Sequence, residues 1–277
     1  MKRVLNELIQ LQELYFAQSE QQSLASDVHS EELEESIQEL IENLPSEIAS
    51  LCERLRRRDL AVIVPVAHGV CSACGMALPT SQTYEIEATE KIYQCPSCSR
   101  ILYSWPGAPR QLKSVGPIGR PRTGVARFSN KSLMRPALKA ETGEGALSEL
   151  VHLMAREGFV ENPEELLQAA LKREVIMTTA VNNGLAFPHV RGVEGGGLTF
   201  SLGLKKEGLE FGAPDGNLTC IIFFIVIPSA ASAFYLRLLS GLIEAFQQEG
   251  ARERLLECTT PDELWETLTS LSQKTIP

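Results

Sequence analysis

The chain lacks any long apolar segment. The longest uninterrupted apolar run, Cys220 to Pro228, is much shorter than the roughly 20 residues that a membrane-spanning helix needs. The basic start Met1-Lys2-Arg3 is followed by a polar amphipathic stretch, so no secretory signal peptide is expected. We therefore expect a cytoplasmic protein that does not insert into membranes and whose thiols stay reduced.

Acidic residues are missing from one part of the chain. None lies between Glu90 and Glu141, although the 277 residues together have a net charge of −9. This interval carries ten positive charges, so the rest of the chain carries −19. Such an asymmetry indicates either a contact with an acidic partner such as nucleic acid, or a solvated segment that its charge keeps soluble. The ten residues are Lys91, Arg100, Arg110, Lys113, Arg120, Arg122, Arg127, Lys131, Arg135 and Lys139.

Apolar side chains are also scarce in residues 105–140, where five prolines and four glycines interrupt any regular element. Few apolar groups and many like charges are typical of disordered segments. The sequence therefore predicts a basic Pro/Gly-rich linker over 105–140.

Histidine is rare, with only four residues in the chain: His29, His68, His152 and His189. We interpret the first three as bystanders. His189 differs because Pro188, which has a fixed φ and no backbone donor, holds the chain rigid in front of it. Its imidazole could act as a nucleophile toward a phosphoryl group, with Arg173 neutralising the phosphate oxygens. From spacing alone, a hydrogen-bonded loop histidine remains the alternative.

Cysteine, by contrast, is present in a distinctive pattern. Two pairs with the spacing Cys-x-x-Cys are separated by twenty residues, and four thiolates at this spacing complete the tetrahedral shell of a structural Zn²⁺. Gly75 and Ser99 follow the pairs, where tight turns need permissive residues. A zinc site explains this pattern better than thiol exchange does. The expected ligands are Cys71, Cys74, Cys95 and Cys98.

Hydrophobic periodicity predicts a multidomain chain. Residues 1–60 read as helices with an apolar stripe that suits a coiled-coil hairpin, with Ser30 and Pro45 at helix starts. Residues 61–104 read as a β zinc ribbon that includes a strand at Tyr84–Glu87. Residues 141–277 read as an α/β domain, in which Asn162 and Glu165 form a capping box. Its helices are expected at 146–157, 163–173, 233–248 and 261–271, and its strands at 198–204 and 218–227.

Residues 141–272 resemble the type-2 enzyme IIA (EIIA) domains of the phosphoenolpyruvate:sugar phosphotransferase system, the fructose, mannitol and nitrogen-regulatory class. The family pattern is Arg-Glu, later Ser/Thr-Thr, then Gly-x-Ala-x-Pro-His. The matching residues are Arg173, Glu174, Thr178, Thr179, Gly184, Ala186, Pro188 and His189. The segments Phe211–Gly216, Ile221–Pro228 and Tyr235–Leu239 fit the hairpin, the central strand and the helix that follow.

This resemblance implies a mixed sheet with flanking helices. It also implies that His189 accepts a phosphoryl group from a histidine-phosphorylated carrier protein while Arg173 steadies the phosphate. We accordingly expect the ring of His189 to be solvent-reachable. One departure concerns a second histidine that many members carry near the first, because Tyr235 stands at its expected position here. Ala180 and Asn182 also replace residues that are often glycine.

The N-terminal part resembles bacterial proteins in which a coiled-coil hairpin precedes a C4 zinc ribbon. Residues 68–79 and 95–103 carry this resemblance, which implies nucleic-acid binding or a scaffold role. The sequence leaves open whether the helices form a homo-oligomer.

Two functions follow as hypotheses. The first is a cytosolic regulatory phosphoacceptor that forms a phosphohistidine at His189 and signals to a partner protein. The alternative is a zinc-ribbon nucleic-acid-binding or scaffold protein whose EIIA-like domain has lost phosphoryl transfer.

Overall fold

The computed structural model describes residues 1–23, 30–67, 69–105, 110–112, 123–193, 195–228 and 232–276, so His29 and His68 lie outside the described residues. The chain divides into two compact units, Met1–Ala108 and Pro109–Pro277. None of the helices in the described ranges combines the length and apolar character that a bilayer crossing requires.

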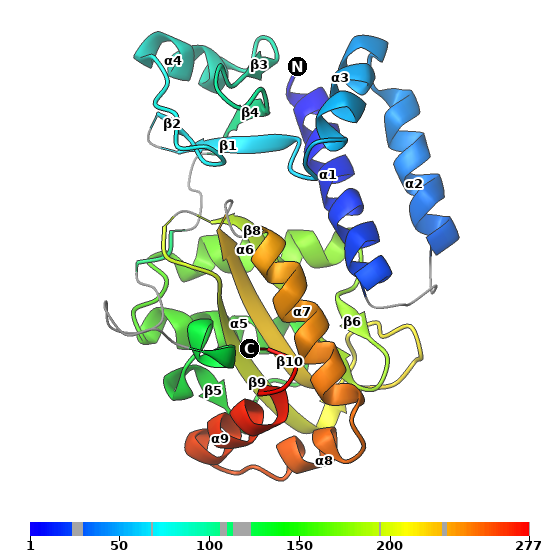
Figure 1. Ribbon diagram of the computed structural model, residues 1–277, viewed down its shortest axis with the longest axis vertical. Helices are drawn as coiled ribbons and strands as arrows, with labels where there is room; N and C mark the ends of the chain where they lie inside the picture. The colour runs from blue at the N-terminus through cyan, green and yellow to red at the C-terminus, as the bar shows by residue number, and fades with distance from the viewer. Residues whose placement is uncertain are drawn as a thin grey trace. The chain divides into compact units, whose positions relative to one another are not determined.

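Three helices open the first unit: α1 (Lys2–Ser23), α2 (Ser30–Asn43) and α3 (Ser46–Arg56). Helices α1 and α2 pack side by side and run in opposite directions (Figure 1). The stripe predicted from spacing is buried, and it comprises Leu5, Leu8, Leu11 and Leu14. Burying such side chains stabilises the hairpin by about 1.5–3 kcal/mol each. The helical prediction is confirmed, while assembly through a coiled coil stays a prediction.

Four short strands form the sheet of the zinc-ribbon segment in the order β2-β1-β4-β3. Strand β1 pairs with β4 in parallel, and β2 and β3 pair antiparallel at the two edges. The first cysteine pair begins in β2, and the second lies in the turn between β3 and β4. The strands are β1 (Ile63–Ala67), β2 (Val70–Cys71), β3 (Tyr93–Gln94) and β4 (Ile101–Ser104).

The strand predicted at Tyr84–Glu87 is wrong, because these residues belong to helix α4 (Thr80–Ala88). Pro79 precedes the helix with φ of −56°, which suits a helix start, and Thr89 ends it in the left-handed conformation. The only buried residue of the helix is Ile86. An alternation of four residues is too short to distinguish a strand from a helix that buries one side chain.

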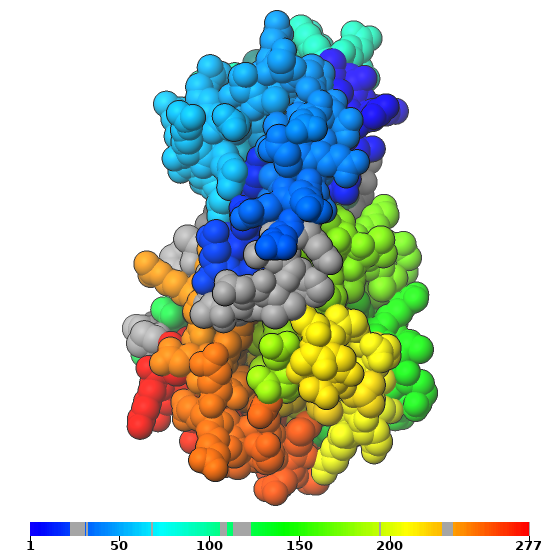
Figure 2. Space-filling view, turned by 90° about the vertical axis from the view of Figure 1, so that its right-hand side faces the viewer, coloured from blue at the N-terminus to red at the C-terminus, as the bar shows by residue number. Residues whose placement is uncertain are grey.

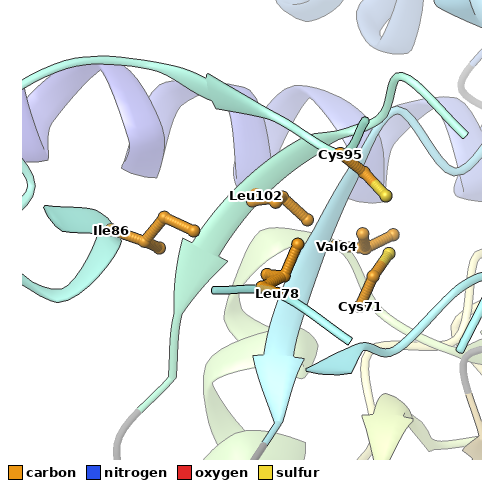
Figure 3. Packing of buried hydrophobic residues seen from close by; sticks show 6 residues of the cluster. All are labelled: Val64, Cys71, Leu78, Ile86, Cys95 and Leu102. Atoms are coloured by element: carbon orange, nitrogen blue, oxygen red, sulfur yellow. The ribbon is translucent and has the colours of Figure 1, made fainter. Parts of the chain in front are cut away.

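The core of the ribbon is small. Figure 3 shows Ile86 at one end of the cluster, and the sulfur atoms of Cys71 and Cys95 at the other. So few apolar side chains do not hold a module of this size without a further link, which a metal ion would supply. The buried residues are Val64, Cys71, Leu78, Ile86, Cys95 and Leu102.

The prediction of a disordered linker over 105–140 is wrong for residues 110–112 and 123–140, which are ordered parts of the second unit. Gln111 is 2% exposed and forms a bridge with Val160. Two short 3-10 helices (Gly124–Arg127 and Lys131–Leu133) lead into strand β5 (Met134–Arg135). The apolar residues here are few, but most of the large ones are buried: Val125, Phe128, Leu133, Met134 and Leu138.

A mixed sheet forms the centre of the second unit. Its order is β5-β9-β10-β7-β6, and β8 also pairs with β10, next to β7 along the same edge. The long strands β9 and β10 form an antiparallel hairpin, whereas β7 and β8 run parallel to β10. The strands are β6 (Ala180–Val181), β7 (Leu185–Ala186), β8 (His189–Val193), β9 (Thr199–Leu209) and β10 (Thr219–Pro228).

Helices cover the sheet, as the resemblance implied, and α7 crosses in front of β10 in Figure 1. Both α5 and α7 pack against β10, whose residues Ile221 to Ile227 are all buried. Phe223 lies at the centre of this core and contacts the rings of Phe187, Phe200 and Phe246. The helices are α5 (Gly143–Arg156), α6 (Pro163–Ile176), α7 (Ser232–Gln247), α8 (Ala251–Leu256) and α9 (Pro261–Ser272).

The capping box lies at a different helix from the predicted one. Asn162 precedes α6, but its side chain accepts no cap hydrogen bond. At α9, in contrast, the hydroxyl oxygen of Thr260 accepts a hydrogen bond from the backbone N–H of Glu263. The carboxylate of Glu263 in turn accepts one from the backbone N–H of Thr260. Thr260 has the extended backbone that this motif needs, with φ of −120° and ψ of 153°, whereas Asn162 has ψ of 86°.

Candidate functional site

A half-buried carboxylate of α6 fixes the chain that follows this helix. The two oxygens of Glu174 accept hydrogen bonds from the backbone N–H of Thr179 at 2.6 Å and from its hydroxyl at 2.8 Å. Burial raises the pKa of Glu174, although the two groups of Thr179 and the nearby charge of Arg173 oppose this shift. Thr178 adds a bond of 2.7 Å to the carbonyl oxygen of Phe211. The segment that leads to the histidine is therefore held at both of its threonines.

A tight turn between β6 and β7 follows. Asn183 and Gly184 both have positive φ, of 70° and 74°, which favours these two residue types. The backbone N–H of Asn183 donates to Asp215 at 2.8 Å, and Arg252 donates to the carbonyl oxygen of Asn183 at 3.0 Å. Figure 2 shows this turn (yellow-green) between the β9–β10 connection (yellow) and the orange helices. These contacts tie the turn to the hairpin and to α8.

His189 is the first residue of β8 and pairs with Ile225 of the central strand. The N–H of Phe187 donates to the carbonyl oxygen of Thr179 at 3.0 Å, and the carbonyl oxygen of Phe187 lies 3.1 Å from Nδ1 of His189. Because a carbonyl oxygen can only accept, this contact assigns the proton of the neutral ring to Nδ1. The lone pair then lies on Nε2, which is the nitrogen that can act as a nucleophile.

Tyr235, from α7, lies against this imidazole. Its hydroxyl oxygen is 3.2 Å from Nδ1 of His189, and the two ring centroids are 5.1 Å apart. The residue at the expected position of the second histidine is thus next to the first one in space. It contributes a neutral hydrogen-bonding group instead of a second imidazole.

Two arginines belong to this region, and the sequence reasoning identified only one of them. Arg173 is 7% exposed, and its Nη1 donates to the carbonyl oxygen of Met177 at 2.9 Å. Arg191 lies two residues after His189 on β8, and its guanidinium carbon is 4.7 Å from the centroid of the Tyr235 ring. The signal that identifies Arg191 is strand alternation, which puts residues i and i+2 on the same face.

The expectation that His189 is solvent-reachable is wrong for this conformation. Its side chain is 1% exposed, and Tyr235 beside it is fully buried. The position of β8 explains this burial, because β8 pairs with the central strand β10 and α6 packs against β8. Any phosphoryl transfer to the ring therefore requires the ring to be uncovered first.

His152 is on α5, with a side chain that is half exposed and lies 3.6 Å from a carboxylate oxygen of Glu164. It does not belong to the group of possible metal ligands found among the described residues.

The four predicted metal ligands lie together in the first unit, with sulfur atoms within 4.8 Å of one another. Cys71 and Cys98 are 3.8 Å apart between sulfurs, and Cys74 and Cys95 are 3.6 Å apart. A tetrahedral Zn²⁺ with bonds of about 2.3 Å requires sulfur separations of about 3.8 Å. The donor set and its geometry therefore fit zinc, and all four cysteines are free of disulfide bonds.

The two turns that present these sulfurs have the same construction. The N–H of Gly75 donates to Cys71, and the N–H of Ser99 donates to Cys95, both at 2.9 Å to the carbonyl oxygen. Gly75 and Ser99 have φ of 74° and 62°, so the prediction of permissive residues after each pair is confirmed.

The thiols of the cluster differ in their pKa values. Burial raises the pKa of Cys71 to about 12 against opposing hydrogen bonds from the backbone, and burial also raises the pKa of Cys95. The pKa of Cys74 is lowered to about 7, because the N–H of Met76 and the neighbouring thiols outweigh its partial desolvation. A divalent cation would allow all four sulfurs to bind as thiolates.

The basic interval is largely neutralised in the described residues. Seven of its ten positive side chains are described, five of these form ion pairs with carboxylates, and Arg127 lies over the ring of Phe128. Tyr93 in the ribbon is covered by Lys91, so its face is not free for a stacked base. These contacts reduce the charge available to nucleic acid. The paired residues are Lys91, Arg100, Arg110, Lys131 and Arg135.

Comparison with known proteins supports both resemblances. The family described as phosphoenolpyruvate-dependent sugar phosphotransferase system, EIIA 2, matches residues 127–271, and the C4-type zinc ribbon domain matches residues 70–102. The fructose-specific EIIA component of Haloferax volcanii is 32% identical over 127 residues, which are 46% of this chain and 82% of that protein.

Other relatives come from two groups. A nitrogen regulatory protein of Pseudomonas aeruginosa is 27% identical over 121 residues, which are 43% of this chain and 78% of that protein. The fructose-specific EIIABC component of Bacillus subtilis is 23% identical over 138 residues, and the chain spans only 22% of its length. The crystal structure of nitrogen regulatory protein IIA-Ntr from Neisseria meningitidis matches 51% of this chain and 97% of that one, with a TM-score of 0.47 and 26% identity.

Proposed function

The chain belongs to the EIIA type-2 family of the phosphoenolpyruvate-dependent phosphotransferase system, and from this premise we propose that it is a regulatory phosphoacceptor. It takes a phosphoryl group on Nε2 of His189 from a histidine-phosphorylated carrier protein in the cytoplasm. The single observation that supports this assignment best is the contact of 3.1 Å between Nδ1 of His189 and the carbonyl oxygen of Phe187. This contact leaves the lone pair on Nε2, where a nucleophile needs it.

The transfer is a balanced displacement at phosphorus. The lone pair of Nε2 of His189 forms the new N–P bond while the N–P bond in the carrier breaks, and the carrier imidazole leaves with that electron pair. The ring of His189 then carries a positive charge, and the Phe187 carbonyl stabilises the retained Nδ1 proton. Arg173 is the proposed cation beside the phosphate oxygens.

Transfer requires the ring to be uncovered, because His189 is 1% exposed, and docking of the carrier would favour this open state. One large apolar side chain within the phosphoacceptor motif is exposed: Val175, which follows Glu174 on α6 and is 87% exposed. A partner that covers this side chain would remove its apolar surface from water, which favours association. We therefore place one contact of the carrier at Val175.

In the first unit, Cys71, Cys74, Cys95 and Cys98 would hold a zinc ion that stabilises the ribbon. The phosphorylated second unit would signal to a regulated partner through the added negative charge and the new hydrogen-bond acceptors. The chain spans about a fifth of the multidomain EIIABC relative, so the sugar specificity of that protein is not transferred here.

The test is carrier-dependent labelling. Purified chain is incubated with enzyme I, the histidine carrier and labelled phosphoenolpyruvate, and phosphohistidine is located by mass spectrometry. We expect label on His189 in the wild type and none in His189→Ala, with His152→Ala as the matched control that keeps its label. Equal labelling of His189→Ala and the wild type would refute the site.

A second function is favoured by the burial of His189. In this alternative the EIIA domain has lost transfer, and the chain is a zinc-ribbon scaffold or nucleic-acid-binding protein. The ion pairs of the basic interval weaken its nucleic-acid form. No label under conditions that label a related EIIA domain, combined with binding to nucleic acid that falls steeply with salt, would establish this alternative.

A further inference from the structure

Strand β8 presents two functional side chains at alternate positions. His189 and Arg191 pair with Ile225 and Ile227 of β10, so both project from the same face of the strand. Tyr235 lies on that face, with its hydroxyl 3.2 Å from Nδ1 of His189 and its ring 4.7 Å from the guanidinium carbon of Arg191. The three side chains therefore form one connected group.

The guanidinium of Arg191 is partly buried. Its Nε and Nη1 atoms are buried, as Tyr235 and His189 are. The ring of Tyr235 stabilises the guanidinium in this position, because a cation over a desolvated aromatic ring is stabilised by up to about 2 kcal/mol. The position of the positive charge is thus fixed by the tyrosine ring.

The chemistry of the product needs such a charge. A phosphohistidine carries close to two negative charges near neutral pH, and Tyr235 can offer it one hydrogen bond but no charge. A guanidinium offers several donors in a plane, which suits phosphate oxygens.

We propose that Arg191 is the second cation of the phosphohistidine site, positioned over His189 by the ring of Tyr235. This inference rests on the proposed function, and it assigns to the Tyr235–Arg191 pair the charge that a second histidine would bring. Arg173 and Arg191 then contact the phosphoryl group from α6 and β8 respectively.

Four variants separate charge from packing. Arg191→Gln removes the charge, and Arg191→Lys keeps it without the planar fork. Tyr235→Phe keeps the aromatic face but removes the hydroxyl, and Arg254→Gln removes an exposed charge from α8 as the matched control. Thermal melting of each protein reports whether it is folded.

Each protein is labelled in two ways: by the phosphorylated carrier, and by phosphoramidate, which needs no carrier. Arg191→Gln should lower both initial rates roughly 10- to 100-fold, as expected for the loss of a charge-assisted hydrogen bond. Arg191→Lys should recover part of the rate, Tyr235→Phe should lose less than tenfold, and the control should match the wild type.

The outcomes separate the two proposals. If phosphoramidate labels His189 and the carrier does not, the proposed function fails, while the phosphoramidate rates still decide the role of Arg191. Rates in Arg191→Gln within twofold of the wild type would overturn this inference alone. If neither donor labels wild-type His189, both proposals are refuted.

Discussion

Removing the carboxylate of Glu174 should lower the unfolding free energy of the second unit, and the hydrogen bonds that are lost determine by how much. Glu174 accepts two hydrogen bonds from Thr179, which is only 8% exposed. In Glu174→Ala, the backbone N–H and the hydroxyl of Thr179 both lose this partner. An unsatisfied buried donor costs about 1–3 kcal/mol, so we expect a loss of about 2–4 kcal/mol, since the hydroxyl can turn toward another acceptor.

Glu174→Gln tests the same reasoning with little change of shape. Its amide oxygen can accept from the N–H of Thr179, and its NH₂ group can donate to the hydroxyl oxygen. We expect this variant to lose less than about 1.5 kcal/mol, because both contacts can persist as neutral hydrogen bonds.

The pH dependence has a definite sign. Burial raises the pKa of Glu174 above its ordinary value of 4.5, so the stability that this group contributes is fully present below pH 4.5. It is lost as the pH rises through the raised value in the folded protein. The wild type should therefore lose stability relative to Glu174→Gln between pH 4.5 and neutral pH.

Tryptophan fluorescence during urea unfolding can measure this. The chain has two tryptophans, Trp105 and Trp265, and Trp265 is on α9 of the second unit. In a Trp105→Phe background the signal reports the second unit alone. The reasoning is refuted if Glu174→Ala loses less than about 0.5 kcal/mol (about half of an ordinary hydrogen bond), or if the two variants lose the same amount.

Three further predictions concern other parts of the chain. Chelation of zinc should abolish the ordered amide signals of residues 61–104 in NMR spectra, and an ordered ribbon with four free thiols would contradict the metal site. Val175→Asp should slow carrier-dependent labelling about tenfold at limiting carrier without changing thermal melting, whereas Met76→Asp in the ribbon should have no effect; equal rates would exclude Val175 from the interface. Thr260→Ala should lower the unfolding free energy of the second unit by about 1 kcal/mol in urea. Because hydrogen bonds from Thr259 and Thr260 hold the pKa of Glu263 below its ordinary value of 4.5, its stabilising contribution should be lost as the pH falls below that value; an unchanged Thr260→Ala protein would remove the capping argument.

The sequence predicted the elements that rest on long, regular patterns. The apolar run from Leu218 to Ile227 became β10, and the spacing of the cysteine pairs predicted a cluster with the geometry that zinc requires. Both signals are strong because each constrains many residues at once. The alternation at Tyr84–Glu87 constrained four residues, and Pro79 in front of it favoured a helix.

Two errors came from reading composition without tertiary partners. Residues 123–140 look like a linker because prolines, glycines and charges dominate them, yet Leu133 and Leu138 are buried against the second unit. Ion pairs such as Arg135–Glu149 and Lys131–Asp262 consume charge that the sequence suggested was free. Neither contact can be recognised from a count of residues, because the partners are distant in the chain.

The burial of His189 also arises from contacts between distant parts of the chain. It favours an inert remnant, but the polar contacts of the ring argue more strongly for a working site. A histidine kept only for packing would incur a desolvation cost that an apolar side chain of similar size avoids. Here the imidazole is fixed by the carbonyl of Phe187, which Thr179 and Glu174 position in turn through hydrogen bonds of 2.6–3.1 Å. Three successive polar contacts of this kind keep one tautomer, with the lone pair on Nε2. Packing alone has no need of a defined tautomer, whereas a nucleophile does, so this chain of contacts favours a working phosphoacceptor that its carrier uncovers.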